Sequence, residues 1–227
     1  MAGPLKLGMV GGGQGAFIGA VHRMAARLDG HWTIVAGALA STPERALASA
    51  QDLGLAADRS YADFTAMAAA ESAREDGIDA VSIVTPNHVH FPAAKAFLEA
   101  GIPVICDKPL TGNGADARAL ADVASRTGTA FVLTHNYTGY PMVRQAREMI
   151  ERGDLGELRL VHVEYVQDWL SEDVESEGVK QAAWRTDPAQ SGAGGAIGDI
   201  GSHAFNLVSF TTQKQVKRLS AQLHSFV

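Results

Sequence analysis

Short apolar runs alternate with helix-like patterns over roughly the first two thirds of the chain. The apolar runs end at glycine, proline or polar turns, and the segments between them space apolar residues three and four positions apart. This pattern predicts strands over residues 5–10, 32–38, 80–84, 104–106 and 131–133, and helices over residues 43–53, 64–73, 92–100 and 115–126, with a further helix through Val21, Met24, Ala25 and Leu28. Such alternation indicates an α/β fold with a doubly wound parallel sheet that helices cover on both faces.

The pattern changes after His135. Residues 142–150 form an amphipathic helical pattern, residues 158–166 show the period of two that is typical of a strand, and residues 219–227 form a last strand-like run. We therefore expect two domains, residues 1–137 and residues 138–227, the second being the beginning of an α+β domain with a mainly antiparallel open sheet. Because an isolated pair of strands is marginal in water, we expect the sequence to be truncated within this second domain.

Composition and charge narrow the class of protein. With 46% hydrophobic and 19% charged residues, the chain is typical of globular proteins. Its 19 Lys and Arg against 25 Asp and Glu give a net charge of −6 that is spread along the chain, which disfavours a nucleic-acid surface. Cys106 is the only cysteine, so neither an intrachain disulfide nor a cysteine zinc cluster can form. Without a signal-peptide pattern or an apolar run of membrane-spanning length, we expect a cytoplasmic protein.

A glycine-rich turn follows the first predicted strand and precedes the first predicted helix. Its residues, Gly11-Gly12-Gly13-Gln14-Gly15-Ala16, match the pattern G-x-G-x-x-G/A. Glycines at these positions make the turn tight and let backbone N–H groups approach a pyrophosphate at the helix N-terminus. The turn therefore predicts dinucleotide binding, and the alternative is a tight turn without a ligand. The residues expected at the cofactor here are Gly11, Gly13, Gln14, Gly15, Ala16 and Phe17.

The end of the second predicted strand suggests which dinucleotide binds. An acidic residue at this place usually grips the ribose 2′-hydroxyl of NAD, but residues 37–43 contain none. Ser41 and Thr42 can donate hydrogen bonds to a 2′-phosphate, and Arg45 can pair with it. These residues favour NADP over NAD. The alternative is a solvated start of the next helix.

Three further sequence motifs follow the glycine turn along the chain. They are Val84-Thr85-Pro86-Asn87-His88-Val89-His90, Cys106-Asp107-Lys108-Pro109 and Gly198-Asp199-Ile200-Gly201-Ser202-His203. Together with the glycine turn they resemble the Gfo/Idh/MocA oxidoreductases, which act mainly on sugars and cyclitols with nicotinamide cofactors bound to a Rossmann domain. The chain differs from the family at Asp107, where Glu is more common. His88 and His90 lack a convincing third ligand, so we expect no metal.

Three residues are candidates for the chemistry. Lys108 follows a buried strand and lies at the carboxyl edge of the predicted sheet, where open α/β folds bind ligands, so its ammonium can polarise a hydroxyl. Asp199 and His203 are four positions apart, and a helix beginning near Gly201 lets both project to one side. Histidine accepts a proton near neutral pH, and a nearby carboxylate holds its ring. The resemblance implies the same roles: an active-site lysine, a substrate ligand at Asp199 and an acid/base at His203. The alternatives are a surface lysine paired with Asp107, a helix-capping Asp199 and a core histidine.

The remaining assignments rest mainly on the resemblance. It implies that Asn136 and Tyr137 line the nicotinamide and substrate cleft. The loops after the later strands are placed to face the cofactor, and Arg185 is a suitable hydrogen-bonding group for a polyhydroxylated substrate, which we also expect to contact Lys108, Asp199 and His203. The loop residues expected at the cofactor are Thr85, Pro86, Asn87, His90, Asp107, Lys108 and Asn136.

These observations predict an NAD(P)-dependent oxidoreductase. It would transfer a hydride between the nicotinamide and a hydroxyl or carbonyl carbon of a sugar, cyclitol or related polyol, with His203 taking the hydroxyl proton. Two alternatives are a glycosidase-like enzyme that retains its nicotinamide and a non-catalytic sensor of sugars or dinucleotides. The resemblance also implies a homo-oligomer, and no nucleic-acid or membrane partner is expected.

Overall fold

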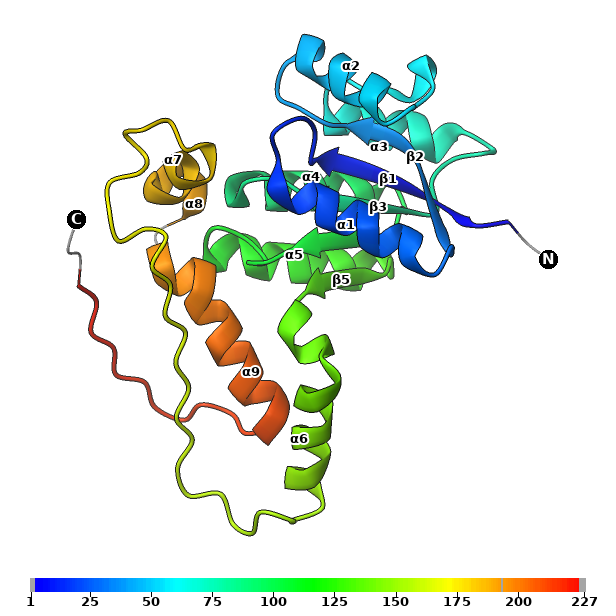
Figure 1. Cartoon of the computed structure of the whole chain (residues 1–227). Coiled ribbons are helices and arrows are strands. Elements are labelled where there is room, and N and C mark those ends of the chain that lie inside the picture. The colour runs from blue at the N-terminus through cyan, green and yellow to red at the C-terminus, as the bar shows by residue number, and fades with distance from the viewer. Residues whose placement is uncertain (1–2, 193, 225–227) are drawn as a thin grey trace. The chain divides into compact units, whose positions relative to one another are not determined.

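The computed structural model describes residues 3–192 and 194–224 and divides into two compact units, residues 1–134 and residues 135–227. Figure 1 shows the helices and strands of the chain. The first unit contains β1 (Leu5–Gly11), α1 (Phe17–Leu28), β2 (Trp32–Ala38), α2 (Pro43–Asp52), the short η1 (Ala57–Arg59), α3 (Phe64–Ala73), β3 (Ala80–Val84), α4 (Asn87–Glu99), β4 (Val104–Asp107), α5 (Gly114–Thr127) and β5 (Phe131–Thr134).

The five strands of the first unit form one parallel sheet in the order β2-β1-β3-β4-β5. This confirms the predicted doubly wound α/β sheet. β1 lies between β2 and β3, with Met9 opposite both Gly37 and Ser82, so the chain leaves β1 in one direction across the sheet and later returns to its other side. The carboxyl ends of β1 and β3 therefore flank the point where the strand order reverses, which is where such sheets bind ligands.

Helices cover both faces of this sheet (Figure 1). On one face, side chains of α3, α4 and α5 pack against the strands in the largest apolar cluster, which includes Phe97, Val81 and Leu120. On the other face, α1 and α2 pack in two smaller clusters around Met9 and Leu7. All five residues of β3 are buried, as expected for a central parallel strand.

One helix boundary differs from the prediction in a way that concerns the site. We expected this helix, α4, to span residues 92–100. The helix begins at Asn87 instead and contains Pro92. Asn87 and His90 therefore lie on the first turn of a helix rather than on a loop.

The second unit is mainly helical. It contains η2 (Asn136–Gly139), α6 (Pro141–Glu151), α7 (Lys180–Thr186), α8 (Pro188–Ser191), the π-helical η3 (Ile197–Gly201) and α9 (Ser202–Thr212). The strands expected at residues 158–166 and 219–227 are wrong for the described residues, which form no strand there, and residues 225–227 lie outside the described part. Strands need partners for their backbone hydrogen bonds, and within the described residues neither segment has one.

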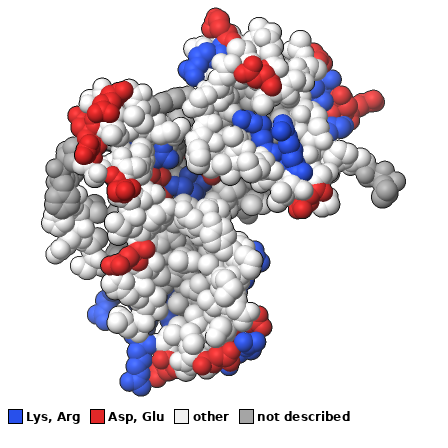
Figure 2. All heavy atoms as spheres, in the orientation of Figure 1, with Lys and Arg blue, Asp and Glu red and all other residues white. Residues whose placement is uncertain are grey.

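The two segments expose apolar side chains. Leu160 and Val166 are more than four-fifths exposed, as is Leu219. Charged side chains of both signs are interspersed on the visible surface (Figure 2). None of the helices in residues 3–192 and 194–224 has the length and apolar character that a membrane span requires.

Candidate functional site

The glycine turn joins β1 to α1 and lies close against its surroundings. Gly11 and Gly12 have φ angles of 77° and 73°, which L side chains rarely adopt. A Cβ at Gly13 would lie 2.6 Å from the Leu39 carbonyl oxygen and 2.5 Å from Ser49 Oγ, so a side chain does not fit. Gly19, which sequence reasoning missed, packs its Cα against Gly12, where a Cβ would lie only 2.4 Å from the Gly12 Cα. The turn is therefore built of bare backbone.

The N-terminus of α1 follows this turn. Ala16 is its N-cap and provides no side-chain hydrogen bond, and the first turn contains no acidic residue. The first N–H groups of a helix have no partners within the helix, and the helix dipole makes this end attractive to anions. Phe17, the first helical residue, is exposed. The residues present here fit the pyrophosphate of a dinucleotide.

Helix α2 fixes the glycine turn from one side. Ser49 Oγ accepts a hydrogen bond from the Gln14 N–H at 3.0 Å and donates to the Arg45 carbonyl at 2.7 Å. The side-chain amide of Gln14 (Nε2) donates a second hydrogen bond, to Asp52 Oδ2 at 2.7 Å. Sequence reasoning missed Ser49, because a serine inside a helix gives no local sign that it contacts a turn more than thirty residues away.

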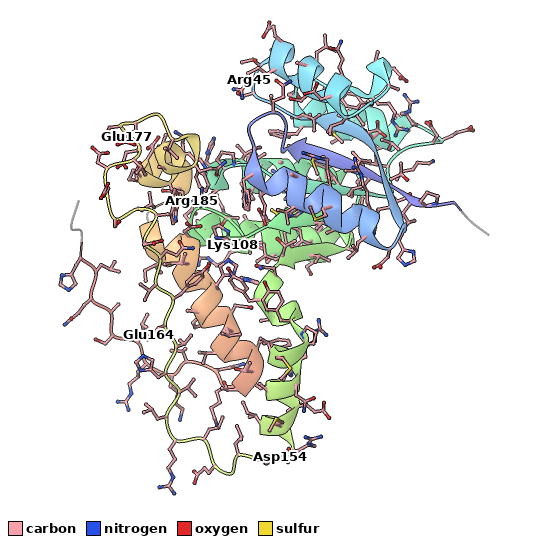
Figure 3. All side chains as sticks on the ribbon, in the orientation of Figure 1. Arg45, Lys108, Asp154, Glu164, Glu177 and Arg185 are labelled. Carbon is pink, nitrogen blue, oxygen red and sulfur yellow. The ribbon has the colours of Figure 1, made fainter. Side chains whose placement is uncertain are left out.

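The residues expected to recognise a 2′-phosphate lie at the start of α2. Ser41, Thr42 and Arg45 are all exposed. Thr42 is the N-cap of α2 and makes no capping bond with its side chain. The Arg45 guanidinium donates a long hydrogen bond of 3.5 Å to the Gln14 carbonyl, which brings it to the glycine turn (Figure 3).

Thr85 follows β3 on the other side of the turn. Its hydroxyl oxygen is buried and has no hydrogen-bond partner among the described residues. Its methyl group would lie 2.9 Å from a Cβ at Gly11, so the hydroxyl belongs to the wall of the same turn. Buried polar atoms nearly always have partners, so an unsatisfied hydroxyl here is available to bond a ligand. A hydroxyl here fits the polar parts of a nicotinamide dinucleotide.

His90 connects two loops at the carboxyl edge of the sheet. It is 1% exposed. Its Nδ1 lies 2.7 Å from the Pro109 carbonyl oxygen and its Nε2 lies 3.0 Å from the Thr85 carbonyl oxygen. Burial lowers the pKa of His90, and the bonds to the two carbonyls act in the opposite direction. Pro86 caps α4, and Asn87, its first residue, is buried.

Asp107 ends β4 within a small polar network. Its Oδ1 accepts a hydrogen bond from Thr134 Oγ1 at 2.7 Å and lies 3.6 Å from His22 Nε2. The other ring nitrogen of His22 lies 2.8 Å from Ser82 Oγ in β3. Burial acts to raise the pKa of Asp107, but the hydrogen bonds from His22 and Thr134 outweigh it, so the pKa lies below its usual value. Sequence reasoning missed His22 and Thr134.

Lys108 lies directly after this network, half-buried in the loop that begins where β4 ends. The peptide bond between Lys108 and Pro109 is cis. β4 runs parallel to its neighbours and ends at Asp107, so Lys108 lies at the carboxyl edge of the sheet, as predicted. Its side chain is labelled in Figure 3.

In the second unit, Arg185 and Asp199 form an ion pair. Arg185 Nε donates to Asp199 Oδ2 at 2.9 Å, and Arg185 Nη1 donates to the carbonyl and to the side chain of Gln181. The guanidinium also lies over the rings of Trp184 and Trp169, 4.2 Å and 5.4 Å from their centroids. Arg185, which we expected at the substrate, is thus in direct contact with Asp199. Sequence reasoning missed this contact, because the two residues are fourteen positions apart.

Asp199 lies in η3 and His203 lies in the α9 helix that follows it. We expected the helix to begin near Gly201, but helical structure extends further toward the N-terminus and is π-helical at Asp199. Such π segments occur frequently at functional sites.

His203 is buried among aromatic rings of its own unit. Its ring centroid lies 4.6 Å from that of Tyr137, 6.0 Å from that of His135 and 6.1 Å from that of Tyr165. The hydroxyl groups of Tyr137 and Tyr165 lie 2.7 Å apart. Tyr137 was expected here, whereas Tyr165 and His135 were missed. Asn136, expected at the cofactor, is exposed at the start of η2.

The predicted site residues thus fall into two groups. The cofactor residues up to Lys108 belong to the first unit, and Asn136, Tyr137, Arg185, Asp199 and His203 belong to the second. Within the described part of the chain, His, Cys, Asp and Glu side chains form no group of three or more that could hold a metal ion.

Comparisons with known proteins identify the class that this fold and these residues define. Residues 5–135 match the Gfo/Idh/MocA oxidoreductases with an NAD-binding Rossmann fold, and residues 143–227 match the C-terminal domain of the same family. The chain belongs to the Gfo/Idh/MocA family of oxidoreductases.

Three relatives illustrate the similarity. An oxidoreductase from Sinorhizobium meliloti is 54% identical with a TM-score of 0.85, and the match covers 100% of this chain and 57% of that one. An inositol dehydrogenase homolog from Azotobacter vinelandii, solved with NAD+, is 37% identical with a TM-score of 0.90 over 94% of this chain and 55% of that one. Levoglucosan dehydrogenase of Pseudarthrobacter phenanthrenivorans is 30% identical over 91% of this chain and 50% of its own. The chain spans about half the length of these relatives, between 50% and 57%.

Proposed function

We propose that the protein is an NAD(P)-dependent oxidoreductase that acts on a hydroxyl or carbonyl carbon of a sugar, cyclitol or related polyol. The observation that carries the proposal is the cradle of bare glycine backbone, the uncapped α1 and the unsatisfied Thr85 hydroxyl around one turn. Two relatives support the substrate class: the inositol dehydrogenase homolog has been solved with NADH and myo-inositol, and the other relative is a levoglucosan dehydrogenase.

In this proposal the first unit binds the dinucleotide. The glycine turn and the α1 N-terminus hold the pyrophosphate through backbone N–H groups, and Thr85 donates a hydrogen bond from its hydroxyl. When bound, the nicotinamide supplies the hydride chemistry. The protein's own task is to bind, to orient and to exclude water.

Lys108, Asp199 and His203 are proposed to act on the substrate. Lys108 donates a hydrogen bond to the reacting hydroxyl and lowers its effective pKa. Asp199, held as a hydrogen-bond acceptor by Arg185, accepts a bond from a substrate hydroxyl. His203 accepts the proton from the reacting hydroxyl during oxidation and returns it during reduction. Tyr137 lies beside the His203 ring and is proposed to line the substrate site.

The choice between NADP and NAD belongs to the same proposal. Ser41, Thr42 and Arg45 are exposed at the start of α2, and no carboxylate lies at the end of β2. These features support a 2′-phosphate, while one relative has been solved with NAD+. We also propose a reducing, cytoplasmic setting, in keeping with the free thiol of Cys106, and a homo-oligomer.

The first experiment titrates the chain separately with NADH and NADPH, following nucleotide fluorescence and the thermal midpoint. A ligand at about a hundred times its dissociation constant adds roughly 2.7 kcal/mol of stability, so binding is readily seen. We expect both to bind, with NADPH tighter. Tighter NADH binding would contradict the role of Ser41, Thr42 and Arg45, and no binding of either would overturn the proposed function.

The second experiment tests the chemistry with myo-inositol and levoglucosan as trial substrates. We expect net reduction of the oxidised dinucleotide with these substrates. A p-nitrophenyl glycoside is tested beside them, because release of p-nitrophenol from it without net reduction would indicate a glycosidase. In His203→Ala, turnover should fall by about a hundredfold or more while dinucleotide affinity stays the same. His162→Ala, which removes a side chain that is 73% exposed, is the control. Unchanged turnover in His203→Ala would refute the proposed role.

A further inference from the structure

His90 bridges the loops that follow two neighbouring strands. Its two ring nitrogens face the carbonyl oxygens of Thr85, just after β3, and Pro109, just after β4, at 3.0 Å and 2.7 Å. β3 and β4 are paired in the sheet, so the bridge spans two adjacent loops at the carboxyl edge. The ring is fully buried and both nitrogens face backbone, so His90 presents neither nitrogen to a ligand.

The two bridged residues, Thr85 and Pro109, lie in loops that carry proposed site residues. Thr85 carries the buried hydroxyl that lacks a partner among the described residues, and Pro109 directly follows Lys108. Both carbonyls can only accept hydrogen bonds. A neutral imidazole therefore donates to one of them, and an imidazolium donates to both.

The strand order indicates which half of a bound dinucleotide would lie toward this bridge. In a sheet of this topology the pyrophosphate lies at the end of β1 and the adenosine ribose lies toward β2. β3 and β4 follow β1 on the opposite side, so the nicotinamide half of a bound dinucleotide would extend toward the two loops that His90 connects.

We infer that His90 is a positioning residue that holds Thr85 and Lys108 in register for the nicotinamide half of the cofactor. This inference rests on the proposed dinucleotide binding. Because both ring nitrogens face backbone carbonyls, His90 acts through the loops that carry Thr85 and Pro109. Removing its ring should therefore lower affinity for the nicotinamide half of the cofactor and leave affinity for the adenosine half unchanged.

The test compares two ligands by calorimetry: NADH, and ADP-ribose, which lacks the nicotinamide. His90→Phe removes both ring nitrogens. The amide of His90→Asn can replace Nδ1 and donate toward Pro109, and the amide of His90→Gln can replace Nε2 and donate toward Thr85. We expect His90→Phe to weaken NADH binding by about tenfold, the Asn and Gln variants to lie between it and the parent, and ADP-ribose binding to stay within about twofold in all three.

Phe97→Leu is the matched control, because Phe97 lies in the same helix, is fully buried and packs in the apolar cluster. It should lower the thermal midpoint and leave the ratio of the two affinities unchanged. Equal weakening of both ligands in the His90 variants, or no change in either, would overturn the inference while the proposed function stands. Failure of the parent chain to bind NADH would overturn both. If His90→Phe does not fold, the Asn and Gln variants decide the question.

Discussion

Asp107 shows how a single side chain at the carboxyl edge of the sheet affects stability. Its pKa in the folded protein lies below the unfolded value near 3.8, because hydrogen bonds from His22 and Thr134 outweigh burial. A carboxylate with a depressed folded pKa contributes stability above the unfolded pKa, and this contribution is lost as the pH falls through the folded pKa. The preceding strand and the following Lys108 should therefore be held less firmly in acid.

Replacing this carboxylate tests the argument. We expect Asp107→Asn to lower the free energy of unfolding by about 1–2 kcal/mol at neutral pH, measured by urea titration. The difference from the parent should shrink below about pH 4, where the parent also loses its carboxylate. Asp122→Asn, at an exposed position in α5, removes the same charge and is the control. A difference that is constant with pH would mean that packing, and not charge, is responsible.

At the scale of elements, a buried ion pair connects η1 to α3. The Arg59 guanidinium donates two hydrogen bonds to the Glu71 carboxylate, which is fully buried and also accepts one from the Tyr61 hydroxyl at 2.7 Å. Burial and the bond to Glu71 raise the pKa of Tyr61 to about 12. Arg59 also lies 3.4 Å from the exposed Asp76 carboxylate, so removing the Glu71 charge leaves the buried guanidinium with a solvent-exposed ionic partner in place of a buried one.

We therefore expect Glu71→Gln to cost about 3–5 kcal/mol of unfolding free energy. The exposed pair of Arg126 and Glu99, 3.0 Å apart, offers a matched control, and Glu99→Gln should cost less than about 1 kcal/mol. Denaturant unfolding of both variants measures the contrast. Similar losses in the two would show that burial does not govern this pair.

The glycine turn offers a second test at this scale. A Cβ at Gly13 would displace Ser49 or the Leu39 carbonyl, so Gly13→Ala should weaken NADH binding by about tenfold or more. Gly3→Ala is the control, because a Cβ there meets no atom within 4 Å. Fluorescence titration compares the two. If Gly13→Ala binds as the parent does, the close fit of the turn is not needed for the ligand.

Prediction from the sequence succeeded where structure depends on neighbours along the chain. The strands of the first unit and the turn at Gly11 are encoded in local apolar runs and glycines, and all five strands were predicted. The strand expected at residues 158–166 failed because a strand also requires a partner. Ser49 and His22 were missed for a similar reason, since their hydrogen bonds join residues 35 and 60 positions apart and leave no local pattern.

At the scale of the whole molecule, burial is unequal between the two units. The apolar clusters that the described residues form all lie in the first unit. Among the described residues of the second unit, Ala182 is the one hydrophobic residue that is fully buried. Segments with few buried apolar contacts open more readily than a packed core.

Proteolysis should therefore begin in the second unit. Arg159 is 85% exposed within the irregular segment that follows α6, so we expect trypsin to cut there before it cuts anywhere in residues 5–134. Mass spectrometry of early fragments identifies the first cut. Arg159→Gln should delay it without changing the thermal midpoint. First cuts within the sheet of the first unit would contradict this ranking of local stability.

Cys106 lies in β4, one position before Asp107, and is fully buried. Burial raises the pKa of its thiol, and the thiolate is the form that alkylating reagents attack. Labelling at this position must therefore wait for the strand to open. Because Cys106 is the only cysteine, the rate of thiol labelling reports how often the strand that precedes Lys108 opens. The factor by which a bound dinucleotide lowers the labelling rate of Cys106 measures how much of the binding free energy stabilises this edge of the sheet against opening.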